Sequence, residues 1–271
     1  MRMLWPTPAA DVDPLVVYAA PERAPVGERP WVLVNMISTV DGAAADPEGR
    51  SGGLGGPADR RVFGAVRAVA DVIVAGAGTI RDENYRPARL PDAVVDVRTA
   101  RGQAERPRIA VVSASLRLDP GTPLFDDPTT RRPLVVTTES ADPAARRRLE
   151  PVADIVVAGR HRVDWPAALA AVREATGAAV VVVEGGPSVN GQLVDEGLVD
   201  ELCLTLGPSL AGGTAPRITA GRGERRGDGL RPLRLAHVLE SDGFLLLRYV
   251  VDHRGRDAAG QEPGTGPAAD A

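Results

Sequence analysis

Four consecutive valines at positions 180–183, followed by Glu184-Gly185-Gly186-Pro187, constrain the fold of this chain more than any other stretch. A short β-branched run without polar alternation is typical of a strand covered on both faces, as in a parallel sheet. The two glycines permit a sharp turn close to a ligand, and Pro187 suits the first turn of a helix. The stretch therefore predicts a strand that ends in a carboxylate, followed by a helix N-terminus that attracts phosphate. A tight turn without a ligand is the alternative.

Three other apolar runs, each predicted to be a buried strand, end in polar or glycine-rich turns. Residues 31–39 lead to Asp41-Gly42, residues 71–75 to Gly76-Ala77-Gly78-Thr79, and residues 108–112 to Ser113-Ala114-Ser115. The carboxyl ends of parallel strands meet at one edge of a sheet, where open α/β folds bind their ligands. We expect backbone N–H groups for phosphate at that edge, together with the carboxylates of Asp41 and Glu184. Asp41 alone can equally be a plain turn aspartate.

The remaining patterns predict one α/β domain with helices on both faces of the sheet. Helical spacing covers residues 57–70, 165–176 and 187–196, whereas residues 81–106 are typical of a polar connection. Two apolar runs, residues 233–239 and 244–251, flank Asp242-Gly243 and indicate a hairpin. We expect a mostly parallel central sheet closed at its edge by this antiparallel hairpin.

The predicted organisation has three parts. Residues 1–29 form an N-terminal arm with one short helix, residues 30–251 form the domain, and residues 252–271 form a disordered tail.

Composition excludes several classes of function. All 32 basic residues are Arg and the formal net charge is −4, so nucleic acid is not an expected partner. Cys203, the single cysteine, lies in an apolar run and is expected to be a buried thiol, and the three histidines lack metal-ligand spacing. No run reaches the roughly 18 apolar residues of a membrane span, and no Walker lysine or nucleophile elbow is present. We expect a cytoplasmic protein that binds no metal and leaves the chemistry to a bound cofactor.

A set of motifs occurs in a fixed order along residues 29–251. They are Thr39-Val40-Asp41-Gly42, Gly49-Arg50-Ser51, Arg67-Ala68 with Asp71, Gly76-Ala77-Gly78-Thr79, Val112-Ser113-Ala114-Ser115-Leu116 and Glu184-Gly185-Gly186 with Leu193. The set resembles the reductase family of bacterial riboflavin biosynthesis, the RibD C-terminal domain type, which has a dihydrofolate-reductase-like fold. The zinc deaminase domain of bifunctional relatives needs more than one cysteine, so the chain is similar to a stand-alone form.

The resemblance implies an NADPH-dependent reductase of 5-amino-6-(5-phosphoribosylamino)uracil, with hydride transfer to the sugar C1′ of the ring-opened imine. The residues that match NADPH contacts of the family are Ser38, Gly76, Gly78, Thr79, Glu83, Ser113, Gly185, Gly186, Pro187 and Ser188. Ser51, Arg67 and Glu184 match substrate contacts, and Asp41 and Glu184 are the candidate catalytic residues. Arg67 is the expected partner of the substrate phosphate, although its position near a helix end also fits a solvated arginine. A homodimer is implied as well.

The chain departs from the family on the substrate side. Many relatives have Lys at the position of Asn35, an aromatic residue at that of Gly53, and Asp-Asp-Pro within the segment Asp82-Glu83-Asn84-Tyr85-Arg86-Pro87. These differences leave NADPH binding in place and the identity of the substrate open. The alternatives are reduction of dihydrofolate or another imine on the same fold, and an NADP-binding protein without turnover.

Overall fold

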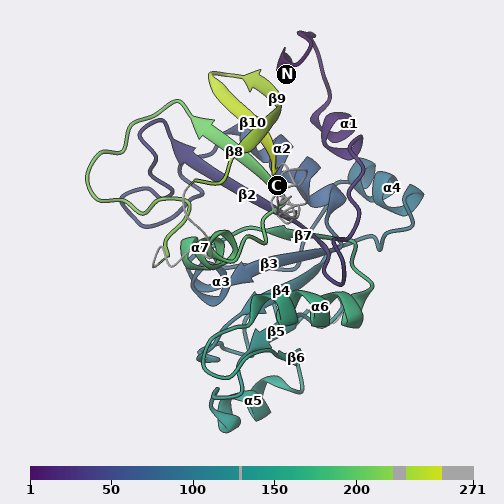
Figure 1. Ribbon diagram of the computed structural model, residues 1–271, viewed down its shortest axis with the longest axis vertical. Helices are drawn as coiled ribbons and strands as arrows, with labels where there is room; N and C mark the ends of the chain where they lie inside the picture. Colours follow the sequence, from purple (N-terminus) through teal and green to yellow (C-terminus); the bar gives the residue numbers. More distant parts are fainter. Residues whose placement is uncertain (128–129, 222–229, 252–271) are drawn as a thin grey trace, which may run out of the picture.

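The computed structural model describes residues 1–127, 130–221 and 230–251, and these residues form a ten-stranded sheet (Figure 1). The strand order is β1-β9-β10-β8-β2-β7-β3-β4-β5-β6. The strands from β8 to β6 pair in parallel, and β10, β9 and β1 continue the sheet with antiparallel pairings. The predicted α/β class, with a mostly parallel sheet and an antiparallel C-terminal hairpin, is confirmed. The predicted tail, residues 252–271, lies outside the described residues.

β7 (Val180–Val183) is an interior strand of the parallel part and lies between β2 (Trp31–Thr39) and β3 (Val72–Gly76). Its four valines are buried, as a strand covered on both faces requires. The other parallel strands are β4 (Arg108–Val112), β5 (Leu134–Thr137), β6 (Asp154–Val157) and β8 (Glu201–Gly207). Since these strands run in one direction, the turns after β2, β3, β4 and β7 share one edge of the sheet.

The predicted hairpin is formed by β9 (Leu233–Ser241) and β10 (Phe244–Val251). Asp242 and Gly243 have φ of 56° and 80°, and positive φ at both positions is what a type I′ turn demands. The hairpin is not the edge of the sheet, which corrects the prediction, because β1 (Arg2–Trp5) pairs with β9. β1 was not predicted, because its four residues before Pro6 do not alternate between apolar and polar side chains over a long enough stretch.

Helices cover both faces of the sheet, as predicted. On one face α1 (Pro14–Ala19), α2 (Pro57–Val69), α3 (Ala77–Asp82) and α5 (Pro143–Leu149) contribute to a core that includes Tyr18, Val66 and Leu149. On the other face α6 (Trp165–Thr176) and α7 (Pro187–Asp195) contribute Leu169 and Leu193 to a second core. None of the described helices is both long and apolar enough to cross a membrane.

Helix α4 (Asp92–Ala100) lies within the segment that was predicted to be an irregular connection, so that prediction was wrong. Its two buried residues are Val94 and, one turn later, a fully buried arginine, Arg98. Nη1 of Arg98 donates to the backbone oxygens of Arg67 at 3.1 Å and Ala70 at 2.5 Å, where α2 ends. A charged residue at the position that faces the core hides the helical pattern in the sequence.

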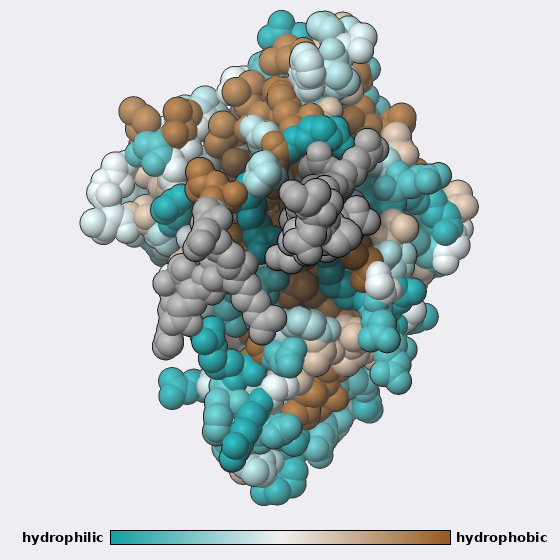
Figure 2. Space-filling model, in the orientation of Figure 1, coloured by the Kyte–Doolittle hydropathy of each residue, from teal (hydrophilic) through white to brown (hydrophobic). Residues whose placement is uncertain are grey.

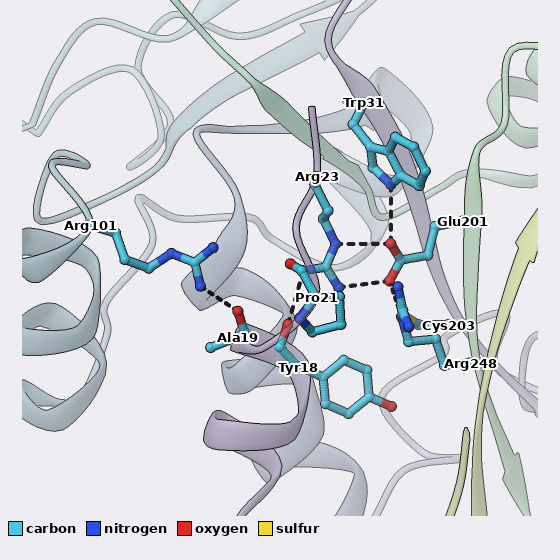
Figure 3. Close-up of polar contacts among 9 residues, drawn as sticks. All are labelled: Tyr18, Ala19, Pro21, Arg23, Trp31, Arg101, Glu201, Cys203 and Arg248. Atoms are coloured by element: carbon cyan, nitrogen blue, oxygen red, sulfur yellow. Dashed lines mark hydrogen bonds and ion pairs between the residues drawn. The ribbon is translucent and has the colours of Figure 1, made fainter. Parts of the chain in front are cut away.

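A buried ion-pair cluster ties the N-terminal segment to the sheet (Figure 3). Glu201 Oε2 accepts from Arg23 Nε at 2.9 Å and from Trp31 Nε1 at 3.1 Å. Its Oε1 accepts from Arg23 Nη2 at 2.8 Å and from Arg248 Nε at 2.6 Å. Burial raises the pKa of Glu201, but the hydrogen bonds and charges of the two arginines outweigh burial and lower it to about 2. Cys203 lies beside this cluster and is buried, as expected.

Candidate active site

Two glycine turns contact each other at the carboxyl edge of the sheet. The turn after β7 has Gly185 at φ 96° and a cis peptide between Gly185 and Gly186, and Gly185 O accepts from Gly76 N at 2.8 Å. A Cβ at Gly186 would lie 2.9 Å from Thr79 Oγ1, and one at Gly76 would lie 3.2 Å from Val189 Cγ2. Side chains at these positions would therefore collide with the opposite turn. The glycines allow the approach that forms the floor of the site.

The larger cavity at this edge has a volume of about 900 Å³. It is bordered by three of the predicted turns, with Gly76, Gly78 and Thr79 from the first, Ser113 from the second, and Gly186, Pro187 and Ser188 from the third. The N-terminus of α7 opens into it, which favours a negatively charged group. The volume and the glycine-rich lining of this cavity are compatible with a dinucleotide whose pyrophosphate lies at the helix N-terminus. Gly185 does not border this cavity, but its backbone oxygen accepts a hydrogen bond from Gly76, which does.

His161 and Arg162 also border the larger cavity, opposite Ser113 and Ser115. They belong to the turn after β6, which the sequence prediction did not include in the site. The signal in the sequence is Gly159-Arg160-His161-Arg162, a glycine and basic residues that follow the apolar run of β6. A guanidinium such as that of Arg162, together with hydroxyls, suits a phosphate on a ribose better than a free 2′-hydroxyl.

A smaller cavity of about 290 Å³ lies on the other side of Thr79, which borders both cavities. Its walls come from β2, the loop around Ser51, α2 and the segment after α3. The residues that face it include Asn35, Met36, Ser51, Asp59, Arg60, Phe63, Arg67, Glu83, Tyr85 and Glu184. The predicted substrate residues Ser51, Arg67 and Glu184 are thus brought together, and Tyr85 is a neighbour that the sequence prediction missed.

Glu184 is held by three hydrogen bonds in the wall of this smaller cavity. Arg67 Nε donates to Oε1 at 2.7 Å, Arg67 Nη2 donates to Oε2 at 2.6 Å, and the Tyr85 hydroxyl donates to Oε2 at 2.6 Å. The side chains of Glu184 and Arg67 are 2% and 16% exposed. The Arg67 guanidinium also lies 4.1 Å from the centroid of the Phe63 ring, a cation–π contact. Arg67 thus gives two of its guanidinium N–H groups to Glu184, whose carboxylate balances its charge.

Burial and the ion pair between Arg67 and Glu184 determine the pKa values of Arg67 and Tyr85. Burial lowers the pKa of Arg67, but the charge and hydrogen bonds of Glu184 outweigh it and hold the pKa above its ordinary value. Burial raises the pKa of Tyr85, and the nearby carboxylate of Glu184 raises it further. Tyr85 consequently keeps its proton and Arg67 its charge at any pH near neutrality.

Glu83, a predicted cofactor residue, contacts the loop of Ser51 instead of the larger cavity. Its Oε1 accepts from the backbone N and from the Oγ of Ser51, both at 2.8 Å. Glu83 borders the smaller cavity, so the structure places it on the side of the predicted substrate residues. These two hydrogen bonds hold Ser51 in place beside that cavity.

Asp41 and Ser38 are not brought to either of these two cavities. Asp41 is exposed, accepts from Gly212 N at 2.7 Å and from Ala211 N, and also accepts from the hydroxyl of Thr39. These bonds, the one from Thr39 first, lower its pKa to about 2. Ser38 is buried in β2 beside β8. The geometry therefore gives Asp41 the part of an anchor for the 211–212 turn, in line with the plain turn aspartate considered from the sequence.

Comparison with known proteins adds to this geometry. The sequence family described as the RibD C-terminal domain matches residues 30–247, a range that contains every residue named above for the two cavities. A 2,5-diamino-6-ribosylamino-4(3H)-pyrimidinone 5′-phosphate reductase of Methanothermobacter thermautotrophicus is 30% identical over 227 residues, covering 82% of this chain and 99% of that protein. The reductase of the same name from Archaeoglobus fulgidus is 28% identical over 185 residues, covering 68% and 83%.

A solved structure shows the same fold. The pyrimidine reductase-like protein from Corynebacterium diphtheriae matches with a TM-score of 0.77 at 27% identity, over 89% of this chain and 99% of that one. The matched region is nearly the whole of the Corynebacterium chain, which therefore has no further domain beside the reductase-like one. The motif-based resemblance to a stand-alone form is thereby confirmed.

Proposed function

We propose, since the chain belongs to the RibD C-terminal domain family, that it is an NADPH-dependent reductase of a 6-ribosylaminopyrimidine 5′-phosphate. The substrate implied by the sequence motifs is 5-amino-6-(5-phosphoribosylamino)uracil. The observation that carries the proposal is the junction at Thr79 of a dinucleotide-sized cavity with a smaller cavity that presents an ionised carboxylate. A cofactor and a substrate in these two cavities would meet where hydride transfer requires it.

The larger cavity fits NADPH on the chemistry of its walls. Gly76 and Gly186 let the two turns that border the cavity approach each other, and the N-terminus of α7 attracts the negative charge of a pyrophosphate. Ser113, His161 and Arg162, which border this cavity, would contact a 2′-phosphate. When bound, the nicotinamide would supply hydride to the sugar C1′. Thr79, which borders both cavities, would lie between the cofactor and the substrate.

The smaller cavity would hold the pyrimidine through Glu184, which accepts from a ring N–H, and through Ser51 at its mouth. Because the carboxylate of Glu184 balances the charge of Arg67, the substrate phosphate needs further cations. Arg86 and Arg89 are exposed and border a groove of about 400 Å³ that also touches Arg67 and Tyr85. We assign the phosphate to these two arginines, in place of Arg67.

The homodimer implied by the sequence motifs has a candidate surface on the sheet. Three adjacent pairs of β10 and β8, Leu245 with Leu206, Leu247 with Leu204 and Tyr249 with Leu202, lie on one face and remain partly exposed. Figure 2 shows hydrophobic residues gathered over the region of β9 and β10. Apolar patches of this kind commonly mark interfaces between protein chains. Light scattering should therefore give about twice the chain mass of 28.3 kDa.

The function is tested by NADPH oxidation with three substrates side by side. These are 5-amino-6-(5-phosphoribosylamino)uracil, its 2,5-diamino-4-pyrimidinone counterpart, and dihydrofolate. Turnover of either ribosylamino compound supports the proposal. Turnover of dihydrofolate alone supports the reductase of another imine, and no oxidation with any of them supports a protein that only binds NADP.

The cofactor is tested separately by thermal unfolding. NADPH at 100 times its Kd should stabilise the fold by about 2.7 kcal/mol, and NADH at the same concentration should give a smaller rise in the melting temperature. Equal shifts would contradict the assignment of a 2′-phosphate site beside Ser113.

A further inference from the structure

The loop of residues 46–56 forms one wall of the smaller cavity through Ser51, Gly52 and Gly55. Five of its eleven residues are glycines, which lose more conformational freedom than other residues when a chain becomes ordered. Such a loop keeps one position only where contacts hold it. The hydrogen bonds made by the loop therefore decide whether the cavity has this wall.

The two halves of the loop are held in different ways. Asp46 N donates to Arg50 O and Arg50 N donates to Asp46 Oδ1, both at 2.8 Å, so the first half is a closed turn. The second half ends at Gly56, where a Cβ would lie 3.0 Å from the ring of Phe244. Ser51 joins the turn to the glycines of the second half.

Glu83 holds Ser51 from outside the loop. Its Oε1 accepts from the backbone N and from the Oγ of Ser51, both at 2.8 Å. In the described part of the chain, no other residue outside the loop is hydrogen-bonded to residues 47–55. Glu83 is itself fixed at the end of α3, because its backbone N donates to Thr79 O at 3.0 Å. The two bonds therefore attach the middle of the loop to the end of a helix.

We propose that Glu83 is a positioning residue, which acts through Ser51 and keeps the loop in place as a wall of the smaller cavity. The inference rests on the proposed function, in which that cavity binds the substrate. Glu83 and Ser51 both border the smaller cavity, and neither borders the larger one. Loss of the two bonds should therefore weaken the binding of substrate and leave the binding of NADPH unchanged.

The size of the effect follows from the fraction of molecules in which the loop is in place. A ligand that binds only to this fraction has an apparent dissociation constant equal to the intrinsic one divided by the fraction. If the loop is in place in about one molecule in ten without the bonds, the KM for the substrate rises about tenfold. The value of kcat stays within about twofold, because at saturation every molecule has the loop in place.

The first test compares two substitutions of Glu83. Glu83→Ala removes both bonds, whereas Glu83→Gln keeps an oxygen at the same reach that accepts from Ser51. The KM for the ribosylamino compound that is turned over should rise about tenfold in Glu83→Ala and stay within about threefold of wild type in Glu83→Gln. A fluorescence titration should give the wild-type Kd for NADPH in both variants.

Glu174→Ala is the matched control for the loss of a carboxylate. Glu174 is exposed on α6 and borders neither cavity, so this variant should keep the wild-type KM and Kd. Thermal unfolding of all three variants verifies that each one is folded.

Trypsin gives a second test, which needs no turnover. Arg50 is exposed and is the single trypsin site within residues 31–59, and cleavage after it breaks the bond to Ser51 N, the group that Glu83 holds. The rate of cleavage follows the population in which the loop is released. Mass spectrometry should detect the new N-terminus at Ser51 about tenfold faster in Glu83→Ala than in wild type, and at the wild-type rate in Glu174→Ala.

Three results would overturn the role of Glu83. They are an unchanged rate of cleavage after Arg50 in Glu83→Ala, a Glu83→Gln variant as impaired as Glu83→Ala, and a loss of NADPH affinity, which would return Glu83 to the cofactor.

Turnover separates this inference from the function on which it rests. If the wild-type protein oxidises NADPH with no candidate substrate but Glu83→Ala speeds cleavage after Arg50, the reductase assignment fails and the attachment of the loop stands. If a ribosylamino compound is turned over with the same KM in wild type and Glu83→Ala, the reductase assignment stands and the role of Glu83 fails.

Discussion

Two buried carboxylates, Glu184 and Glu201, have similar partners and opposite uses. Both lie at the end of a strand in the parallel part of the sheet, Glu184 after β7 and Glu201 at the start of β8, and both pair with arginine through two hydrogen bonds. Glu201 receives four hydrogen bonds from nitrogen donors and is completely buried. Glu184 receives three and borders a cavity. The difference of one acceptor position distinguishes an anchor of the fold from a group that can hold a ligand.

The largest expected effect comes from Glu184→Gln. The amide cannot accept from a ring N–H as strongly as the carboxylate, so kcat/KM for the ribosylaminopyrimidine should fall on the order of a thousandfold. NADPH binding should persist, because the glycine contacts are left intact. Stopped-flow NADPH oxidation and a fluorescence titration of NADPH measure the two effects. Unchanged turnover would show that Glu184 has no part in catalysis and that it serves the fold, as Glu201 does.

Glu201→Gln should act on stability instead. Arg23 and Arg248 would be left in a buried site without the compensating charge, and breaking a buried pair in this way costs about 3–5 kcal/mol. Urea unfolding at pH 7 measures the loss. The protein that remains folded should bind NADPH with wild-type affinity. A weaker affinity for NADPH in the folded protein would show that the ion-pair cluster of Glu201 is coupled to the larger cavity.

The pH dependence of stability should report on Glu201 and its neighbour His237. The pKa of Glu201 falls from 4.5 to about 2 on folding, and burial, with Arg248 next in importance, lowers that of His237 from 6.5 to about 4. The unfolded chain therefore binds more protons than the folded one between pH 6.5 and pH 2, so stability rises with pH over this range. Protonation of each group at low pH removes about 3 kcal/mol of the stability that the fold has at pH 7.

The measurement is the free energy of unfolding in urea at several pH values between 7 and 3. Stability should begin to fall below pH 6.5 through His237 and fall further below pH 4.5 through Glu201. Glu201→Gln should flatten the lower part of this curve. An equally steep curve in the variant would assign the acid sensitivity to other carboxylates.

The sequence predicted the parts of the site that depend on local backbone geometry. The strand of valines, the glycine turns and the helix start at Pro187 each follow from the preferences of a few neighbouring residues. Once the parallel sheet was inferred, Thr79, Ser113 and Gly186 were expected at one edge, and there the structure has them.

The parts that depend on contacts between distant residues were not predictable in this way. Glu201 meets Arg23 and Arg248 across 178 and 47 residues, and no local pattern indicates such a pairing. Tyr85 was missed because it lies in the connection between α3 and α4, where no periodic pattern shows which way a side chain faces. Asp41 was assigned to the site from its position after a strand, but the turn at residues 211–212 occupies its carboxylate.

Arg98 has a consequence for protein engineering. It donates to the backbone oxygen of Arg67 and thereby links helix α4 to the arginine that holds Glu184. The segment from Tyr85 to Arg98 thus borders the smaller cavity through Tyr85 and holds the backbone of Arg67 through Arg98. A loop graft intended to change substrate range at Tyr85, Arg86 or Arg89 must carry α4 with it. A shorter graft would free the backbone of Arg67 from Arg98 and change the acidity and orientation of the site at the same time.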